Sequence, residues 1–543
     1  MNFVEKLSRV RIPLGNDTLD DNIRRAKSIM KLFQNSLTPL VLVCLCSSPV
    51  FAASSLWTND GAEESISGLT PPGALGTNSA PGVSWQEYFK KNQRLKNMNL
   101  GLRFGGNQTL SRNESQLMLP ASLAKIFTAA AALKFLGPHY RFENSFSATL
   151  DHGDFTVRNP VFRVSGDPTW GHEAFEGGLE TTKENLRSRL SKVLDLLRDH
   201  TIRRVQGPIR IESLRPELAG YVRPKGWRDS WKLECMAVMQ TEFQANGNCG
   251  RFVIHSLGRS GWVTDGVSVP VRMRLSKSKE GSNGVRVTPG FDERGMIREY
   301  VFTGYFSKGP LVFDLPVHQG ADWLRNLFLG MLKDAGIEYD EGPRESFDHQ
   351  NSEGIEVDLS SRSMLEILEQ AVPYSINGAM DRIFLEVGMH NQQGLSVEWM
   401  NRMIADLVSN ENLTAGIGLQ DGSGLNLHNR IRADLLYEFL LRLRGESYFR
   451  DLFSSLAVAG KSGTLLNRAT LVASSHTYGR IHAKTGTLNG ITNLAGYFLS
   501  TPGTEPEPFV VLSESDFTAP AARPLIDGIV VNFAAQNSEK TRN

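Results

Sequence analysis

The amino-acid sequence predicts an α/β protein in which a domain of helices and an antiparallel sheet is interrupted by a large β-rich insertion. Residues 126–136 are an apolar, helix-favouring run, and residues 144–357 consist mostly of short strand patterns with turn signals. Past residue 358 the chain returns to helical periodicity and then to strands. A chain of 543 residues is also too long for one compact core, so we expect two or more domains.

The N-terminal segment predicts export. Lys27 and Lys31 precede the apolar residues 37–46, and a small-residue cleavage pattern ends at Ala52. The apolar run is too short to cross a bilayer as a mature helix. We therefore expect residues 1–52 to be an upstream segment with a signal peptide, and the mature chain to lie in the periplasm or cell envelope, with peripheral envelope association.

The start of the mature chain is expected to be flexible. Residues 1–29 lack an apolar core, so Met1 and Met30 both stand as translation starts. Residues 53–84 are rich in Gly, Ser, Pro and Asn and predict a flexible lead-in, and order is expected from Trp85.

Three segments are expected to follow the lead-in. A catalytic domain would begin over residues 85–143, be interrupted by the insertion over 144–357, and resume over 358–543. A strand over 100–104 precedes the helix that ends before Gly137-Pro138. Asn489-Gly490 predicts a hairpin turn. The other expected elements are strands over 146–150, 155–158 and 162–169, helices over 184–200, 322–335, 363–372, 379–387 and 398–408, strands over 478–484, 492–500 and 509–513, and a helix over 521–535.

Composition excludes several classes of function. The net charge is +1 and no basic stripe occurs, so nucleic acid is not expected as a partner. No glycine-rich phosphate loop and no zinc-type cluster of Cys and His is present in the sequence, so no cofactor and no metal are expected. Cys44 and Cys46 would leave with the signal peptide. Cys235 and Cys249 remain, and export favours a disulfide between them over two buried thiols.

Ser122 and Lys125 stand where the first helix begins. Residues three apart on a helix share one face, so the lysine amine can reach the serine hydroxyl. A serine hydroxyl becomes a useful nucleophile when a neighbouring base takes its proton. The spacing alone is a weak signal, since Ser276 and Lys279 repeat it without a following helix.

Two further short motifs carry suitable chemistry. Ser375 and Asn377 lie on a connection between expected helices and offer a hydroxyl and an amide. Lys484, Thr485 and Gly486 lie at the end of an expected strand, where they offer a cation, a hydroxyl and room for a substrate backbone. Residues 461–464 nearly repeat the sequence that begins at Lys484, but they lie in a Gly-rich connection and are set aside.

The order S-x-x-K, S-x-N, K-T-G resembles penicillin-binding proteins and serine β-lactamases. The wide first gap and shorter second gap are similar to the D-alanyl-D-alanine carboxypeptidase/endopeptidase family of low-molecular-mass penicillin-binding proteins, whose catalytic domain carries a large insertion. The spacing of the two remaining cysteines is similar to the cysteine pair of that insertion. Three more stretches resemble this family: 165–169, 421–425 and 484–497.

The resemblance implies a role for each motif in peptide hydrolysis. Ser122 would attack the carbonyl between two D-alanines, and Lys125 would take its proton. Backbone N–H groups of Ser122 and Thr487 would form the oxyanion hole. Ser375 would relay a proton to the leaving amine, and Asn377 would hold the peptide amide.

The same resemblance implies the partners. Lys484 and Thr485 would bind the terminal carboxylate, and Gly486 would let the substrate backbone approach. The substrates would be peptidoglycan peptides. β-Lactam antibiotics would acylate Ser122 as inhibitors.

Two alternatives stay open. In one common class of β-lactamase the acyl-enzyme is hydrolysed with a glutamate in an E-x-x-L-N motif, but residues 398–401 lack the leucine and follow S-x-N. A non-catalytic cell-wall scaffold is the other. The sequence departs from the family at one position that concerns specificity. Relatives often carry an arginine where Leu427 stands, and the nearest arginine here is Arg430, so the substrate side chain that is recognised stays open. The balance between carboxypeptidase and endopeptidase activity stays open too.

Overall fold

The computed structural model describes residues 82–105, 109–175, 182–220, 223–257, 262–264, 269–278, 281–342, 352–501 and 503–538. All of the described residues belong to one compact unit that begins at residue 74. The expected signal peptide and nearly all of the lead-in lie outside the described residues. Within those residues, no helix has the length and apolar character needed to span a membrane.

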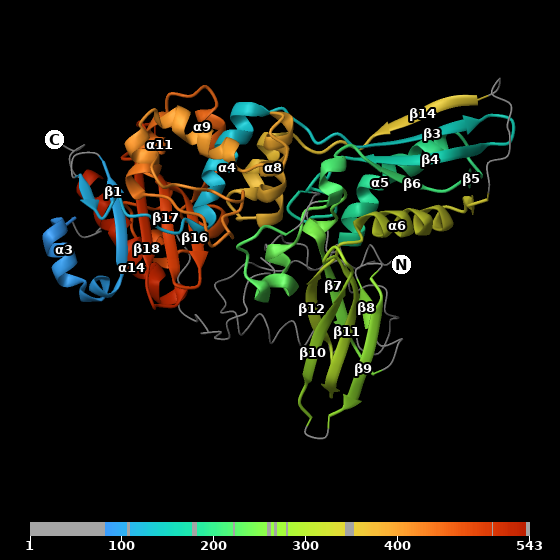
Figure 1. Ribbon diagram of the computed structural model, residues 1–543, viewed down its shortest axis with the longest axis horizontal. Coiled ribbons are helices and arrows are strands. Elements are labelled where there is room, and N and C mark those ends of the chain that lie inside the picture. Colours follow the sequence, from blue (N-terminus) through green and yellow to red (C-terminus); the bar gives the residue numbers. More distant parts are fainter. Residues whose placement is uncertain are drawn as a thin grey trace, which may run out of the picture. The chain divides into compact units, whose positions relative to one another are not determined.

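A six-stranded antiparallel sheet forms the base of the catalytic domain (Figure 1). Its order is β15 (Ala457–Val458), β16 (Ile481–Leu488), β17 (Ile491–Phe498), β18 (Glu507–Glu514), β1 (Asn99–Phe104) and β2 (Leu110–Arg112). Asn489-Gly490 forms the turn between β16 and β17, with Gly490 at φ 79°. The N-terminal strand β1 therefore completes a sheet whose other long strands come from the end of the chain.

Alternate residues of this sheet face two different cores. Val510 and Leu512 of β18 pack with the helical cluster, whereas Phe509 and Val511 pack on the opposite side with α14. The period of two is that of a strand buried on both faces. The helices are α3 (Trp85–Lys91), α4 (Ala124–Phe135), α7 (Met364–Ala371), α8 (Asn377–His390), α9 (Glu398–Val408), α10 (Glu411–Thr414), α11 (Ala433–Leu443), α12 (Phe449–Ser454), α13 (Ala469–Val472) and α14 (Ala519–Ser538).

Helix α4 lies at the centre of the helical cluster. Every residue from Ala124 to Leu133 is buried, as expected for a helix that is apolar on all sides. The helix ends where predicted, since Gly137 takes the left-handed conformation at φ 83°. The expected helices over 363–372, 379–387, 398–408 and 521–535 are all present, with ends displaced by a few residues.

The inserted residues form three further sheets. One has the order β13 (Glu338–Asp340), β5 (Arg204–Gln206), β4 (Thr156–Val164), β3 (Ser145–Asp151) and β14 (Ser352–Asp358), with β6 (Arg210–Ser213) also paired to β4; helices α5 (Thr182–Asp199) and α6 (Gly320–Asp334) share its core. The other two have the orders β10 (Gly284–Phe291), β11 (Ile297–Phe306), β9 (Val271–Lys277) and β12 (Leu311–Pro316), β7 (Cys249–Ile254), β8 (Trp262–Thr264). The two expected strands over 155–158 and 162–169 are wrong as separate elements, because β4 is continuous and ends at Val164.

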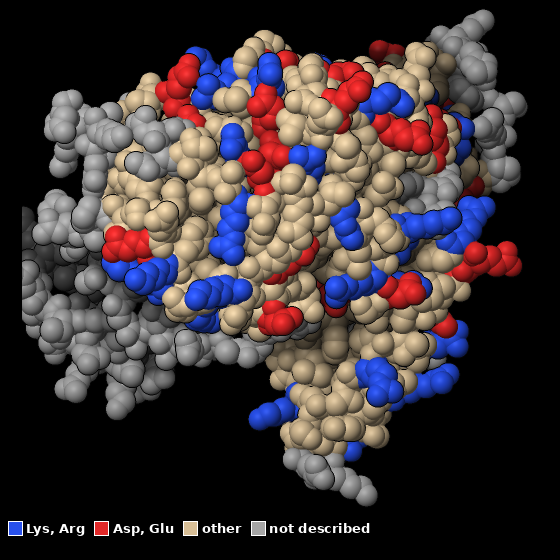
Figure 2. Space-filling model, turned by 60° about the vertical axis from the view of Figure 1, so that its left-hand side comes forward, with Lys and Arg blue, Asp and Glu red and all other residues tan. Residues whose placement is uncertain are grey.

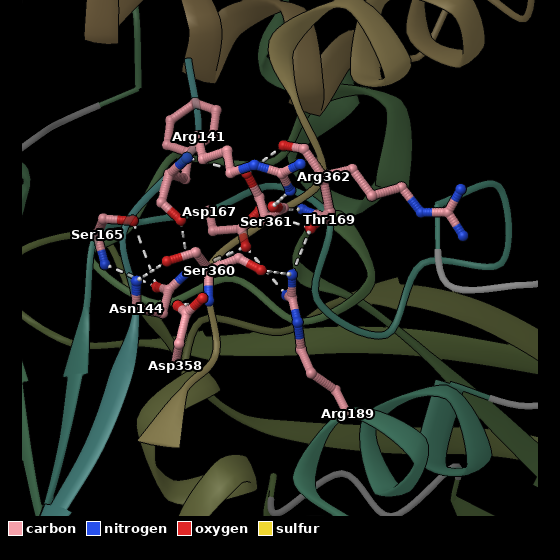
Figure 3. A network of polar contacts seen from close by, with 11 residues as sticks. Arg141, Asn144, Ser165, Asp167, Thr169, Arg189, Asp358, Ser360, Ser361 and Arg362 are labelled. Carbon is pink, nitrogen blue, oxygen red and sulfur yellow. Dashed lines mark hydrogen bonds and ion pairs between the residues drawn. The ribbon is translucent and has the colours of Figure 1, made fainter. Parts of the chain in front are cut away.

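A buried polar network joins the insertion to the catalytic domain (Figure 3). Asn144, on the outgoing chain, donates from Nδ2 to Asp167 Oδ2 at 3.0 Å and accepts the backbone N–H of Ser165 at 3.1 Å. Asp167 also accepts from Thr169 and from Arg189 Nη1, the latter at 3.0 Å. Arg189 also donates from Nη2 to the carbonyl of Ser360, on the returning chain beyond the insertion, at 3.3 Å, so the segment 165–169 noted in the sequence helps to hold the junction.

Most charged side chains of the view in Figure 2 lie on the surface, whereas one cluster of charged side chains is buried. Lys and Arg side chains are interspersed with Asp and Glu over the face in Figure 2. Glu386 of α8, by contrast, is fully buried and accepts from Arg382 Nη2 at 2.5 Å, from Arg215 Nη2 at 2.5 Å and from Tyr140 OH at 2.5 Å. Because Arg215 belongs to the insertion, this cluster is a second polar tie between the insertion and the catalytic domain.

Candidate active site

Ser122 lies in a tight turn that is fixed to the central sheet. The turn is the 3₁₀ segment Ala121–Leu123, and Ala121 has φ 47°. Asn493 of β17 donates from Nδ2 to the carbonyls of Leu119 and Pro120 at 2.9 and 3.0 Å. These bonds satisfy backbone groups ahead of the helix and hold the serine at the edge of β16.

Two glycines let neighbouring segments approach this turn. A Cβ at Gly486 would lie 2.6 Å from the carbonyl oxygen of Pro120, and one at Gly424 would lie 1.9 Å from that of Ala121. Both distances are shorter than any real contact of a methyl group, so only glycine fits at either place. The glycine of K-T-G therefore serves the packing of the strand against the turn that carries Ser122.

Lys125 is buried and bonded to three acceptors. Its Nζ lies 2.9 Å from Ser122 Oγ, 2.7 Å from Asn377 Oδ1 and 2.6 Å from the carbonyl of Ser423. Burial lowers the pKa of Lys125 to about 8, against the opposing charges of Asp381 and Asp421. An amine that is neutral in part of the population near neutral pH, in contact with a serine hydroxyl, can act as a general base.

Lys484 lies beside Ser375 of the S-x-N motif. Its Nζ donates to Ser375 Oγ and to the carbonyl of Thr485, both at 2.9 Å. Burial, followed by the charge of Lys125, holds the pKa of Lys484 well below its usual range. Ser375 has φ 61°, a left-handed conformation that is uncommon for a residue with a side chain. Such strain is found at functional sites, and here it places the hydroxyl against Lys484.

Asn377 bonds at both ends of its amide. Its Oδ1 accepts from Lys125, and its Nδ2 donates to the carbonyl of Met236 in the insertion at 3.0 Å. Met236 follows Cys235, which forms the predicted disulfide with Cys249 at a Cα–Cα distance of 5.4 Å. The insertion thus contributes a backbone group to the orientation of Asn377.

The loop that begins at Asp421 contributes a group that the sequence reasoning missed. The Asp421 carboxylate accepts from the backbone of Gly424 and Asn426, from Asn429 Nδ2, and from Trp227 Nε1 in the insertion, at 2.7–3.0 Å. These bonds shape the loop whose Ser423 carbonyl meets Lys125. The stretch 421–425 was noted in the sequence, but nothing local there indicates a bond to the lysine.

The near-copy over residues 461–464, set aside as a K-T-G motif because it lies in a connection, contacts the K-T-G motif in the fold. Thr464 Oγ1 lies 3.0 Å from Thr485 Oγ1, and the Thr464 N–H donates to the carbonyl of Pro373, just before S-x-N. Gly463 takes φ 58° there, with Pro373 too close for any side chain. The segment lies in a 3₁₀ turn, as its glycines indicate, yet the fold brings it to K-T-G.

The remaining predicted positions lie at the rim. Thr487 is exposed on β16 opposite Thr492. Leu427 is half-buried, and its backbone N–H donates to the carbonyl of Gly226. Arg430 donates from Nη1 to the carbonyls of Leu427 and Asn429, so its guanidinium is bound to its own loop. Among the described residues, no group of three or more His, Cys, Asp or Glu side chains could hold a metal ion.

Comparison with known proteins places this arrangement in context. The sequence model of the D-Ala-D-Ala carboxypeptidase 3 (S13) family matches residues 87–536. The D-alanyl-D-alanine carboxypeptidase of Actinomadura sp. (strain R39) is 26% identical over 443 residues, which cover 79% of each chain. D-alanyl-D-alanine carboxypeptidase DacB of Haemophilus influenzae is 21% identical over 401 residues, covering 72% of this chain and 79% of the relative.

A solved structure supports the fold. The crystal structure of penicillin binding protein 4 (dacB) from Haemophilus influenzae aligns with a TM-score of 0.60 at 19% identity. The alignment covers 82% of this chain and 97% of the other. The predicted α/β fold, with helices and an antiparallel sheet, is confirmed.

Proposed function

Because this chain belongs to the D-Ala-D-Ala carboxypeptidase 3 (S13) family, we propose that Ser122 is the nucleophile of a serine-type D-alanyl-D-alanine carboxypeptidase, with endopeptidase activity on peptidoglycan cross-bridges. The observation that carries the assignment is the buried amine of Lys125, 2.9 Å from Ser122 Oγ, between the S-x-N and Asp421 segments. No simple structural role requires a buried lysine at a serine hydroxyl, since burying a charge is costly.

Acylation follows from these contacts. Neutral Lys125 takes the proton of Ser122 as Oγ attacks the carbonyl carbon between two D-alanines, and the C–N bond of the resulting tetrahedral intermediate then breaks. The developing oxyanion is bound by the backbone N–H groups of Ser122 and Thr487, which belong to the two segments that pack together at Gly486. Ser375 passes its hydroxyl proton to the departing amine and receives one in return from protonated Lys484, whose Nζ lies 2.9 Å from Ser375 Oγ.

The substrate is held by its carboxylate and its amide. Lys484 and the hydroxyl of Thr485 bind the terminal carboxylate, which supplies the negative charge that a buried lysine needs in order to be protonated. Asn377 has one N–H not used by Met236 and presents it to the peptide. Water then attacks the acyl carbon and releases Ser122.

β-Lactams fit the same steps. A β-lactam offers a strained amide with a carboxylate in the place of the terminal one, so Ser122 opens the ring and stays acylated. The β-lactamase alternative lacks support from the structure, because Glu398 lies at the exposed start of α9 and accepts from Ser396 Oγ at 3.0 Å. The scaffold alternative does not account for two buried lysines bonded to serine hydroxyls.

Export completes the proposal. The basic and apolar segment ahead of Ala52 would deliver the chain to the periplasm or cell envelope, where peptidoglycan lies. An oxidising compartment also agrees with the disulfide Cys235–Cys249.

Two measurements test the function. Fluorescent penicillin should label the unmutated protein covalently and leave the Ser122→Ala variant unlabelled; persistent label on that variant would remove Ser122 from its role. Digestion of purified peptidoglycan followed by mass spectrometry should show loss of D-Ala from pentapeptides and conversion of dimers to monomers. Rapid loss of the label would instead favour the β-lactamase, and absence of any label the scaffold.

A further inference from the structure

Asp381 is a buried carboxylate on the face of α8 that carries Asn377. It is 4% exposed and lies four residues, about one helical turn, beyond Asn377. Residues four apart on a helix point the same way, so both side chains are directed toward α4 and Lys125. Asn377 bonds to the lysine directly at 2.7 Å. Asp381 instead accepts a backbone N–H, that of Ser423, at 2.7 Å.

The peptide groups of Ser423 link Asp381 to the base. While the N–H of Ser423 bonds to Asp381 Oδ1, its carbonyl accepts from Lys125 Nζ at 2.6 Å. The location of the carboxylate therefore determines where this carbonyl lies. The carbonyl in turn determines how the amine of Lys125 approaches Ser122.

Asp421, the other acid near Lys125, differs from Asp381 in how it is satisfied. Asp421 accepts four hydrogen bonds that shape its loop. Asp381 Oδ2 and Ser423 Oγ, both buried, make no well-formed hydrogen bond among the residues that the structure describes, although the Ser423 hydroxyl is close enough to lower the pKa of Asp381. A buried carboxylate whose donors all come from one residue is costly when charged, and such groups concentrate at functional sites. The loop can be held by Asp421, so structure alone does not require an acid at position 381.

We propose that Asp381 is a positioning residue for acylation, which holds the Lys125 amine against Ser122 through the Ser423 peptide and whose charge sets the pH at which that amine becomes a base. This inference rests on the proposed function of Ser122 and Lys125.

The charges around Lys125 give the sign of the effect. Asp381 on α8 and Asp421 on its loop raise the pKa of Lys125, whereas burial lowers it by more. Lys484 on β16 also faces the site, and burial, followed by the charge of Lys125, lowers its pKa. Burial and the charge of Asp421 raise the pKa of Asp381, whereas the hydrogen bonds of Ser423 and the charge of Lys125 lower it. Replacing Asp381 by a neutral group removes support for the charged lysine, so the neutral amine persists to lower pH.

The experiment measures the rate of covalent labelling of the full chain by fluorescent penicillin between about pH 5 and pH 10. Asp381→Asn keeps an acceptor for Ser423 and removes only the charge. We expect the midpoint of its acidic limb to move to lower pH by about one unit. Asp381→Ala also removes the acceptor, and we expect its labelling rate to fall about tenfold at every pH. The final extent of labelling counts the folded sites, so each rate is taken per labelled molecule.

A matched control separates this role from stability. Asp527 of α14 is also buried and pairs with Arg468, away from the residues that contact Lys125. Asp527→Asn should lower the melting temperature and leave the midpoint of the pH profile unchanged. A midpoint in Asp381→Asn equal to that of the unmutated chain would overturn the inference, as would losses confined to melting temperature and labelled fraction in both Asp381 variants. Absence of label on the unmutated chain would overturn the proposed function and this inference together.

Discussion

The disulfide Cys235–Cys249 is expected to support acylation as well as stability. It spans 14 residues, and closing a loop of that length contributes about 3 kcal/mol in the chain-entropy model. Met236, next to Cys235, accepts from Asn377 Nδ2 at 3.0 Å, while Asn377 Oδ1 accepts from Lys125. A hydrogen bond of this kind contributes about 0.5–1.5 kcal/mol, so losing the bond to Met236 would weaken by that amount the hold on the Asn377 amide beside Lys125. If that energy is expressed in the transition state, the acylation rate falls about two- to tenfold.

The assay compares the unmutated chain with Cys235→Ala/Cys249→Ala, each with and without dithiothreitol, by penicillin labelling well below the melting temperature. Reductant should slow only the unmutated chain, to the rate of the double variant, and chemical denaturation should show a loss of about 3 kcal/mol in the double variant. Labelling of the double variant at the unmutated rate, despite its lower stability, would show that the disulfide does not act on Asn377. Equal slowing of both proteins by dithiothreitol would also refute the argument.

Two further predictions follow from contacts outside the motifs. Thr464→Val removes the hydroxyl 3.0 Å from Thr485 Oγ1 and should raise KM for D-Ala release about three- to tenfold with little change in kcat, whereas Thr464→Ser should restore it. Burial raises the pKa of Glu386, but Arg382, Arg215 and Tyr140 together lower it to about 2. The ionised Glu386 therefore contributes to the free energy of unfolding in full above about pH 4.5, and this contribution is lost as the pH falls toward about 2. Glu386→Gln should therefore cost about 3–5 kcal/mol at pH 7 and reduce the pH dependence of unfolding in that acidic window, as measured by urea denaturation; an unchanged slope there would contradict the assignment.

Local signals in the sequence predicted the elements that local physics determines. The run over 126–136 is mostly apolar and predicted a helix, and Gly137 ends it as α4 requires. Asn489-Gly490 predicted the hairpin because those residues accept the dihedral angles of a tight turn. The strand expected over 478–484 was placed too early, since Gly479 turns at φ 67° and β16 begins at Ile481. Lys484 therefore lies inside the strand, with its backbone paired on β17.

What the sequence could not predict is which distant segments meet. Thr464 was set aside because it lies in a turn. That reasoning gave the correct secondary structure, but it does not bear on where the Thr464 hydroxyl lies, since a turn can present a hydroxyl to a site as well as a strand can. Asp381 gave no signal, because an acid on a helix is ordinarily a solvated residue. Its role depends on the Ser423 peptide, which comes from a loop 42 residues further on.

The same contacts bear on why the catalytic domain tolerates so large an insertion. Trp227 donates to Asp421, whose loop packs through Gly424 on the turn of Ser122, and Met236 accepts from Asn377. Trp227, Leu425 and Leu488 also share a small apolar cluster at the end of β16. Each motif that carries chemistry is thus one contact or two from an inserted residue. The insertion therefore borders the proposed active site, and its Phe175 and Leu218 also pack in the core of the helical cluster, so a change in its fold would reach Lys125, Asn377 and that core alike.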